Sequence, residues 1–230
     1  MSDTPQGDDG PDRTAAFWDA AAATYDDEVD HGLRDPVARE AWRALLAEAL
    51  PTGPCLVADL ACGTGTLTEL LAEAGHDVHG VDLSAAMVAL ARAKTARFGP
   101  AVRIERGDAS SPPLPPGSFD VVLGRHIVWA LPDPRAALRT WVSLLRPGGR
   151  LVLVEGVWGV PSGSAPPSSP VRWRAGVPAA ELAAYLLGLE PVEAVDVRAL
   201  DAPAYWGHPV GDERYRLVAT LRDVPAQVDG

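Results

Sequence analysis

Apolar and polar positions alternate along the chain in blocks that predict strands and helices in turn. Between residues 55 and 155, short apolar runs of strand length are separated by stretches with apolar residues three and four positions apart. Two later strand-like runs follow each other without a helix between them, which predicts an antiparallel hairpin at one sheet edge. The predicted strands are 55–61, 77–82, 102–107, 119–124, 150–155, 192–199 and 213–221. This order predicts an α/β fold with a mainly parallel, doubly wound sheet that helices cover on both faces.

Capping and breaking residues mark the ends of the predicted helices. Ser84 and Asp133 are expected to cap the N-termini of two helices, the second with a proline at its first position. Gly75 is expected to end the first helix after residue 61 in a left-handed conformation.

Helices are also predicted outside this alternating region. Two precede the first strand, at 14–24 and 35–50, and one follows the fifth strand, at 178–188. The face of the second helix that we expect to be buried consists of Val37, Ala41, Leu45, Leu46 and Ala49.

Charge and composition exclude several classes of function. The chain has 230 residues and a formal net charge of −11, which repels phosphate backbones and argues against a nucleic-acid substrate. The acidic start lacks the features of a signal peptide, and no apolar run reaches the length of a membrane span. Cys55 and Cys62 form neither a disulfide framework nor a metal-ligand spacing, so we expect no metal and a cytoplasmic protein.

A glycine-rich turn follows the first predicted strand, in the sequence Asp59-Leu60-Ala61-Cys62-Gly63-Thr64-Gly65. Glycines there let the backbone turn sharply and let a ligand approach closely. Nicotinamide and flavin enzymes use a similar turn, but they need a third glycine where this chain has Thr68. Asp59 would also face the pyrophosphate of a dinucleotide, whereas a cationic, phosphate-free cofactor such as S-adenosylmethionine suits it.

Further acidic residues end the second and third strands. Asp82 can accept hydrogen bonds from both ribose hydroxyls, and Leu83 and Met87 can pack on an adenine ring. Asp108, with Ala109 beside it, can accept from the adenine amino group. Because the carboxyl ends of parallel strands share one edge of the sheet, these groups predict a nucleoside site there.

These motifs resemble the class I S-adenosylmethionine-dependent methyltransferase family, in particular its type 11-like, small-molecule members. DLACGTG, VDLS, GDAS and the LRPGG turn carry the resemblance, which covers the central hundred residues or so. It implies a Rossmann-like seven-stranded sheet of order 3-2-1-4-5-7-6, with strand 7 antiparallel. It also implies that Asp59, Gly63 and Gly65 bracket the methionine part of the cofactor, Asp82 the ribose and Asp108 the adenine. The chain departs from the family at Ala61, where many members have glycine, and we expect this residue to crowd the turn slightly.

The resemblance also suggests how the chain is organised. In many small-molecule members a Tyr-Asp pair near the N-terminus closes over the cofactor carboxylate, and Tyr25-Asp26 occupies that place. The expected organisation is a disordered tail (1–12) and a single methyltransferase domain (13–230), made of an N-terminal helical cover (13–50), a cofactor-binding core (55–156), a loop (157–177), and a C-terminal helix with an edge hairpin (178–221).

Methyl transfer from a sulfonium depends mainly on positioning, so few catalytic residues are needed. His126, after the fourth strand, is the best candidate base, and Arg125 beside it could contact the acceptor or the cofactor carboxylate. His31 is a second candidate near the expected cover, and His208 a weaker one. Each has an alternative, purely structural explanation.

Tryptophans offer flat surfaces for an acceptor. Trp42 and Trp141 are expected in the core. Four others lie in loop regions where they could line an acceptor pocket or simply pack: Trp129, Trp158, Trp173 and Trp206.

The sequence therefore predicts a methyltransferase acting on oxygen or nitrogen of a small metabolite, in specialised metabolism, as a monomer or homodimer without nucleic-acid or membrane partners. Two alternatives remain open. One is a nicotinamide-dependent oxidoreductase, and the other is a non-catalytic protein that binds S-adenosylmethionine.

Overall fold

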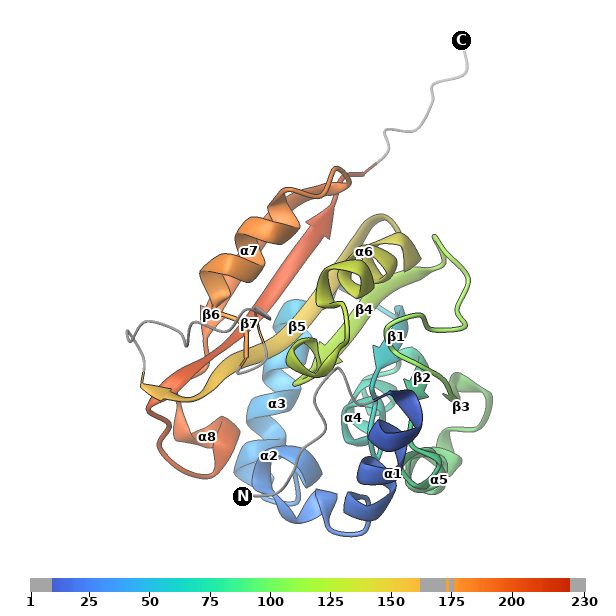
Figure 1. Cartoon of the computed structure of the whole chain (residues 1–230). Coiled ribbons are helices and arrows are strands. Elements are labelled where there is room, and N and C mark those ends of the chain that lie inside the picture. The colour runs from blue at the N-terminus through green and yellow to red at the C-terminus, as the bar shows by residue number, and fades with distance from the viewer. Residues whose placement is uncertain (1–9, 162–172, 174–175, 224–230) are drawn as a thin grey trace.

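One mixed sheet organises the chain, and its strand order is β3-β2-β1-β4-β5-β7-β6 (Figure 1). The computed structural model describes residues 10–161, 173 and 176–223. The strands are β1 (Leu56–Leu60), β2 (Asp77–Asp82), β3 (Val102–Arg106), β4 (Phe119–Arg125), β5 (Leu145–Pro161), β6 (Val192–Ala199) and β7 (Asp212–Leu221). β7 pairs antiparallel with both β5 and β6, and the other pairs are parallel. The predicted order and the antiparallel seventh strand are confirmed.

Helices cover both faces of this sheet. They are α1 (Pro11–Ala21), α2 (Val29–Gly32), α3 (Pro36–Ala49), α4 (Thr66–Glu73), α5 (Ala85–Thr95), α6 (Pro134–Leu144), α7 (Ala179–Leu187) and α8 (Pro203–Trp206), with short 3-10 turns η1 (Tyr25–Asp27), η2 (Ala96–Ala101) and η3 (Val128–Ala130). α6 and α7 pack on one face, while α3, α4 and α8 pack on the other (Figure 1). None of the helices in the described residues is long and apolar enough to cross a lipid bilayer.

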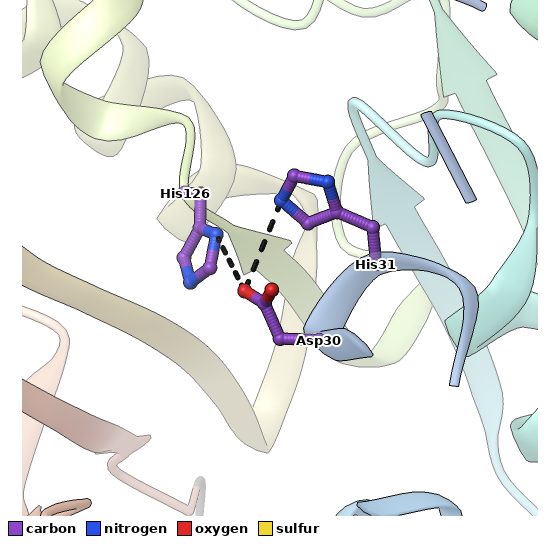
Figure 2. Close-up of side chains that lie close together, drawn as sticks. All are labelled: Asp30, His31 and His126. Atoms are coloured by element: carbon purple, nitrogen blue, oxygen red, sulfur yellow. Dashed lines mark ion pairs between the residues drawn. The ribbon is translucent and has the colours of Figure 1, made fainter. Parts of the chain in front are cut away.

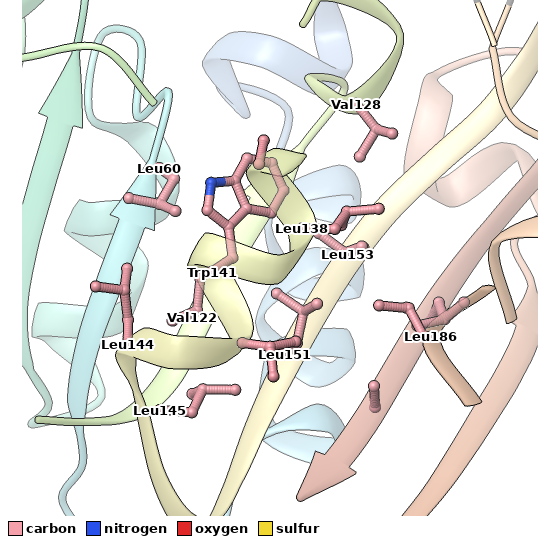
Figure 3. Packing of buried hydrophobic residues seen from close by; sticks show 14 of the residues in the cluster. Leu60, Val122, Val128, Leu138, Trp141, Leu144, Leu145, Leu151, Leu153 and Leu186 are labelled. Carbon is pink, nitrogen blue, oxygen red and sulfur yellow. The ribbon is translucent and has the colours of Figure 1, made fainter. Parts of the chain in front are cut away.

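Trp141 of α6 lies at the centre of the larger core cluster (Figure 3). Its side chain is fully buried among Leu60 of β1, Val122 of β4 and Leu153 of β5. Its indole Nε1 donates a hydrogen bond of 2.7 Å to the carbonyl oxygen of Ala109, in the segment after β3. Trp141 therefore joins α6 to one end of the sheet, and the prediction that it is a core residue is confirmed.

The predicted helix caps are confirmed by their hydrogen bonds. The Ser84 hydroxyl accepts from the backbone N–H of Met87, and the Asp133 carboxylate accepts from that of Ala136. Gly75 has φ of 89°, the left-handed conformation expected of it.

Several boundaries differ from the prediction. α1 begins at Pro11, inside the predicted tail, because proline is favoured in the first helical turn. β5 continues to Pro161, so the predicted loop (157–177) begins inside a strand that pairs with β7; most of the rest of that loop lies outside the described residues.

Two further predictions about helices need correction. The predicted buried face of α3 is confirmed at Leu45, Leu46 and Ala49, but Val37 is 65% exposed, because Ala38 and Trp42 face the core in the first half of the helix. α8 lies within a stretch predicted as loop, because four residues are too few for helical periodicity to show.

Candidate functional site

A pocket opens at the carboxyl ends of the parallel strands, where ligands of open α/β sheets bind; its empty space, counted with the open solvent at its mouth, is about 960 Å³. Ten of the thirteen site residues predicted from the sequence line it. They are Tyr25, Ala61, Gly63, Asp82, Leu83, Met87, Asp108, Ala109, Arg125 and His126. The sequence therefore identified the residues that the ends of the strands and their adjoining segments contribute to the pocket.

Asp82 ends β2 and holds two backbone segments together at the pocket. Its Oδ2 accepts a 2.8 Å hydrogen bond from the N–H of Gly63, and its Oδ1 accepts one of 2.9 Å from Ser84. The side chain is only 8% exposed, and burial raises the pKa of this carboxyl. Asp82 thus presents a fixed acceptor to the pocket, positioned by the glycine turn on one side and the α5 N-terminus on the other.

Asp59 and Gly65 lie near the pocket but are not among its described lining residues. Asp59 is 3% exposed and accepts a 2.6 Å hydrogen bond from the hydroxyl of Thr68; burial raises its pKa to about 6. Thr68, which replaces the third glycine of a dinucleotide turn, therefore anchors Asp59. At Gly65, where φ is 80°, a Cβ would lie 2.9 Å from that of Ala91, so close packing of α5 requires glycine.

Ala61 turns the chain away from β1 in a left-handed conformation, with φ of 56°. A Cβ is disfavoured in this region, so a glycine at this position would adopt the same turn at a lower conformational cost.

The N-terminal helix closes one side of the pocket. Pro11, Thr14 and Trp18 of α1 line it, and none of them was predicted from the sequence. Asp19 fixes α1 beside α5, because its Oδ1 accepts hydrogen bonds from the hydroxyl of Ser84 and the N–H of Ala86. The sequence predicted an N-terminal helical cover, but it did not single out any residue of α1 as part of the site.

The two members of the Tyr25-Asp26 pair have different positions. Tyr25 lines the pocket, and its ring stacks on that of His31 with the centroids 4.2 Å apart. Asp26 points elsewhere, forming an ion pair of 2.8 Å with Lys94 and accepting a hydrogen bond from Thr64. Asp26 therefore ties the cover to the glycine turn and to α5.

His126 follows β4 in a strained backbone conformation, with φ of 55°. Two kinds of hydrogen bond hold it there. Its N–H donates to the carbonyl of Val154 over 2.9 Å, and Glu155 Oε1 accepts from the N–H groups of Ile127 and Val128 at 2.8 and 2.9 Å. Glu155, which the sequence did not single out, thus fixes the segment that carries His126.

Glu155 is fully buried, and burial raises the pKa of its carboxyl to about 7 from 4.5. Between these pH values the unfolded chain has lost this proton while the folded chain keeps it, so the free energy of unfolding falls as pH rises. In Glu155→Gln the amide oxygen can still accept both N–H groups, but nothing titrates. From pH 4.5 to 8, wild type should therefore lose up to about 3 kcal/mol relative to the variant. Urea unfolding of both proteins at the two pH values measures this, and an unchanged difference would show that Glu155 does not bind a proton in this range.

His126 and His31 meet at Asp30, in a cluster that we call the His-Asp cluster (Figure 2). Asp30 Oδ2 lies 3.8 Å from Nε2 of His31 and 4.0 Å from Nδ1 of His126. Burial lowers the pKa of both imidazoles, and the positive charge of Arg125 lowers them further. Both rings are therefore neutral at pH 7, and His126 lines the pocket.

Arg125 connects this cluster to β4. Its Nη1 donates a hydrogen bond to the backbone carbonyl of Asp30, and its guanidinium lies over the ring of Trp42 at 5.2 Å. α2 is thereby fixed beside the end of β4. Asp30 was not predicted, because only the fold brings it next to residue 126.

The other histidines and tryptophans considered from the sequence are not among the described residues that line the pocket. His76 accepts from the N–H of Cys55, His79 pairs with Glu105 at 2.9 Å, and His208 is exposed. Of the four tryptophans considered for the pocket, none is among its described lining residues. Trp173 and Trp206 are buried in the two core clusters, and the ring of Trp158 contacts that of His126, with centroids 4.6 Å apart.

Comparison with known sequences agrees with this arrangement. Residues 58–153 match the protein family described as Methyltransferase domain. The chain is 34% identical over 149 residues to a demethylmenaquinone methyltransferase of Renibacterium salmoninarum, covering 64% of this chain and 60% of that one. It is 38% identical over 96 residues to a ubiquinone biosynthesis O-methyltransferase of Ralstonia nicotianae, covering 41% and 40%. The chain thus spans 60% or less of the length of these two relatives.

Solved structures share the fold at low identity. The cyclase SpnF superposes with a TM-score of 0.72 at 20% identity, over 97% of this chain and 99% of that one. A 1,6-didemethyltoxoflavin-N1-methyltransferase of Burkholderia thailandensis gives a TM-score of 0.64 at 24% identity, over 93% and 91%.

Proposed function

We propose that this chain, which belongs to the class I S-adenosylmethionine-dependent methyltransferase family, transfers a methyl group from that cofactor to oxygen or nitrogen of a small metabolite. The observation that carries the proposal is the placement of Asp82. Its buried carboxylate is hydrogen-bonded to the glycine turn and lines the pocket. The sequence contains no Walker-type phosphate-binding motif. This arrangement suits a phosphate-free nucleoside whose ribose hydroxyls donate hydrogen bonds.

Each part of the cofactor has candidate residues. Asp82 would accept from the ribose, Asp108 from the adenine amino group, and Leu83 and Met87 would pack on the adenine ring. Gly63 and Ala61 would face the methionine part, and Tyr25 and Arg125 its carboxylate. Asp59 and Gly65 would act indirectly, by shaping the turn from beneath.

The transfer itself is an in-line displacement. A lone pair on the acceptor forms the new bond to the methyl carbon, the carbon–sulfur bond breaks, and sulfur keeps that electron pair. The acceptor proton leaves to a base or to water. Alignment of the three atoms supplies most of the acceleration, and His126 and His31 are our candidates for acting on the acceptor.

The relatives suggest where to look for the acceptor. They are named for demethylmenaquinone and for ubiquinone biosynthesis, so quinols and other phenols should come first in an acceptor panel. A role in specialised metabolism predicts turnover with a phenolic or heterocyclic compound outside the quinones.

Binding and activity measurements on the same purified protein test the two alternative functions. A nicotinamide oxidoreductase would bind NADH rather than S-adenosylhomocysteine, which titration of the intrinsic tryptophan fluorescence would reveal. A non-catalytic protein would bind the nucleoside without transferring methyl groups to any acceptor, and the similarity to a cyclase shows that the fold alone does not decide this.

Replacing Asp82 by alanine should weaken S-adenosylhomocysteine binding ten-fold or more, about 1.4 kcal/mol per decade, measured by isothermal titration calorimetry. The variant loses the acceptor for the ribose and the hydrogen bonds that fix Gly63 and Ser84. Asp77, an exposed carboxylate at the other end of β2, provides the matched control, and Asp77→Ala should bind like wild type. Unchanged affinity in Asp82→Ala would remove Asp82 from the site and with it the proposed function.

A further inference from the structure

We propose that the His-Asp cluster, Asp30, His31 and His126, binds one divalent transition-metal ion at the acceptor end of the pocket. One donor atom from each residue lies within 4.8 Å of the other two (Figure 2). Two imidazoles and one carboxylate form a donor set that suits first-row divalent ions such as Zn²⁺ and Fe²⁺. The role of the ion rests on the proposed function, but its binding can be measured without any acceptor.

Hydrogen bonding fixes the tautomer of His31. Its Nδ1 lies 3.3 Å from the backbone carbonyl of Tyr25, and a carbonyl oxygen can only accept, so Nδ1 carries the hydrogen. The neutral ring then has its lone pair on Nε2, the atom that faces Asp30 Oδ2. A ligating histidine usually donates its other N–H to a backbone carbonyl or carboxylate in this way.

His126 approaches the same carboxylate from the other side. Trp158 and Trp206 confine its ring, with centroids 4.6 and 5.8 Å away, and the left-handed backbone fixes its direction. Nδ1 faces Asp30, and Nε2 is buried with no hydrogen-bond partner in the described part of the chain. The separations from Asp30 to the two rings are too long for hydrogen bonds. In the tautomer of His126 that carries its hydrogen on Nε2, Nδ1 has the lone pair, and a cation can then bind all three electron-pair donors at once.

An ion at this cluster requires the three side chains to close slightly. Zinc binds nitrogen and oxygen at about 2.0–2.2 Å, which places two ligand atoms of a tetrahedral site roughly 3.4 Å apart. The two distances to Asp30, 3.8 and 4.0 Å, are within about half an ångström of this value, and the donor atoms of all three residues lie within 4.8 Å of one another. Three protein ligands leave a fourth position open, as in catalytic zinc sites.

Charge near the cluster limits the expected affinity. The guanidinium of Arg125 lies close by, and that of Arg214 stacks on Trp158 and Trp206, 5.0 and 4.4 Å from the ring centroids. The carboxylate of Asp30 supplies one negative charge, while these two guanidinium groups repel a bound cation. We therefore expect a dissociation constant of micromolar order, weaker than at structural zinc sites.

The open position would take an acceptor hydroxyl. A divalent ion lowers the pKa of a bound hydroxyl, which then loses its proton to solvent, and the oxygen attacks the methyl carbon as described above. The inferred substrate class is therefore an acceptor with a hydroxyl group, and a second oxygen beside it would strengthen binding.

Calorimetric titration of the metal-free full chain with Zn²⁺ and with Mn²⁺, in the presence of S-adenosylhomocysteine, tests this proposal. Mn²⁺ is included because thiolates bind it poorly, so Cys55 and Cys62 cannot account for a signal. We expect one site per chain, and Asp30→Asn should weaken it about 100-fold by removing the only charged ligand. His79→Ala is the matched control, because His79 also faces a carboxylate, Glu105, but is not among the described residues that line the pocket. It should bind like wild type.

Thermal unfolding provides the second readout. Zn²⁺ should raise the Tm of wild type and of His79→Ala but not that of Asp30→Asn, since an ion that binds only the folded chain stabilises it. No binding in wild type, or equal binding in Asp30→Asn, would overturn the inference. The affinity for S-adenosylhomocysteine, measured in the same samples, separates the outcomes: its retention leaves the proposed function intact, and its loss in wild type contradicts that function instead.

Discussion

Replacing His126 by alanine should lower kcat about 10²–10⁴-fold with a hydroxyl acceptor found in the panel, the range for losing a group that moves a proton in the transition state. His126 lines the pocket after β4, and its strained backbone is fixed by Val154 and Glu155. Such strain is typical of residues retained for function. The loss should be of this size whether the ring accepts the proton itself or holds an ion that acidifies the acceptor. Initial rates with S-adenosylmethionine at saturation measure it.

The cofactor affinity distinguishes this role from a structural one. Asp82 and Gly63 are separate from His126, so the Kd for S-adenosylhomocysteine should change by less than about two-fold. His79→Ala should retain full turnover. A variant at His126 with wild-type kcat, or with cofactor affinity reduced as much as turnover, would remove this residue from the acceptor chemistry.

Replacing Trp141 by alanine should reduce the free energy of unfolding by about 3–5 kcal/mol, as for other buried large-to-small changes. The indole is fully buried between α6 and the sheet, and its loss leaves both a cavity and the carbonyl of Ala109 without its donor (Figure 3). For a chain of this length the Tm should fall by roughly 6–20 °C. Urea unfolding, with Leu187→Ala on the exposed side of α7 as control, measures the loss, and the control should stay within about 0.5 kcal/mol of wild type.

Trp141→Phe separates the hydrogen bond from the packing. It keeps most of the apolar volume but cannot donate to Ala109, so we expect a loss of about 1–3 kcal/mol. Ala109 lines the pocket beside Asp108, and S-adenosylhomocysteine should therefore bind more weakly to this variant than to Leu187→Ala. Equal stability of Trp141→Phe and wild type would show that the 2.7 Å hydrogen bond contributes nothing.

The strands themselves could be predicted because each carries its own local signal, whereas their order in the sheet came from the family resemblance. Apolar strand centres, the glycine turn after β1 and the caps at Ser84 and Asp133 all depend on residues close together in the chain. The extension of β5 to Pro161 could not be predicted, because it depends on pairing with β7, which lies far away in the sequence. Val37 was misplaced because alanine is too small to mark the buried stripe of α3 clearly.

The pocket was predictable only on its sheet side. Residues such as Asp82, Asp108 and Arg125 follow strands directly, and the ends of parallel strands converge. Trp18 belongs to a helix whose position depends on Asp19 reaching α5, and Asp30 meets His126 across 96 positions of sequence. No local spacing encodes such contacts, which is why both residues were missed.

The attachment of α1 makes one wall of the pocket sensitive to solvent. Asp19, which bonds the α5 N-terminus, is exposed, so water competes for both of its hydrogen bonds. Each bond therefore contributes little to the free energy that holds α1 on α5, and the apolar side of the helix, where Ala15 is buried, carries more of it.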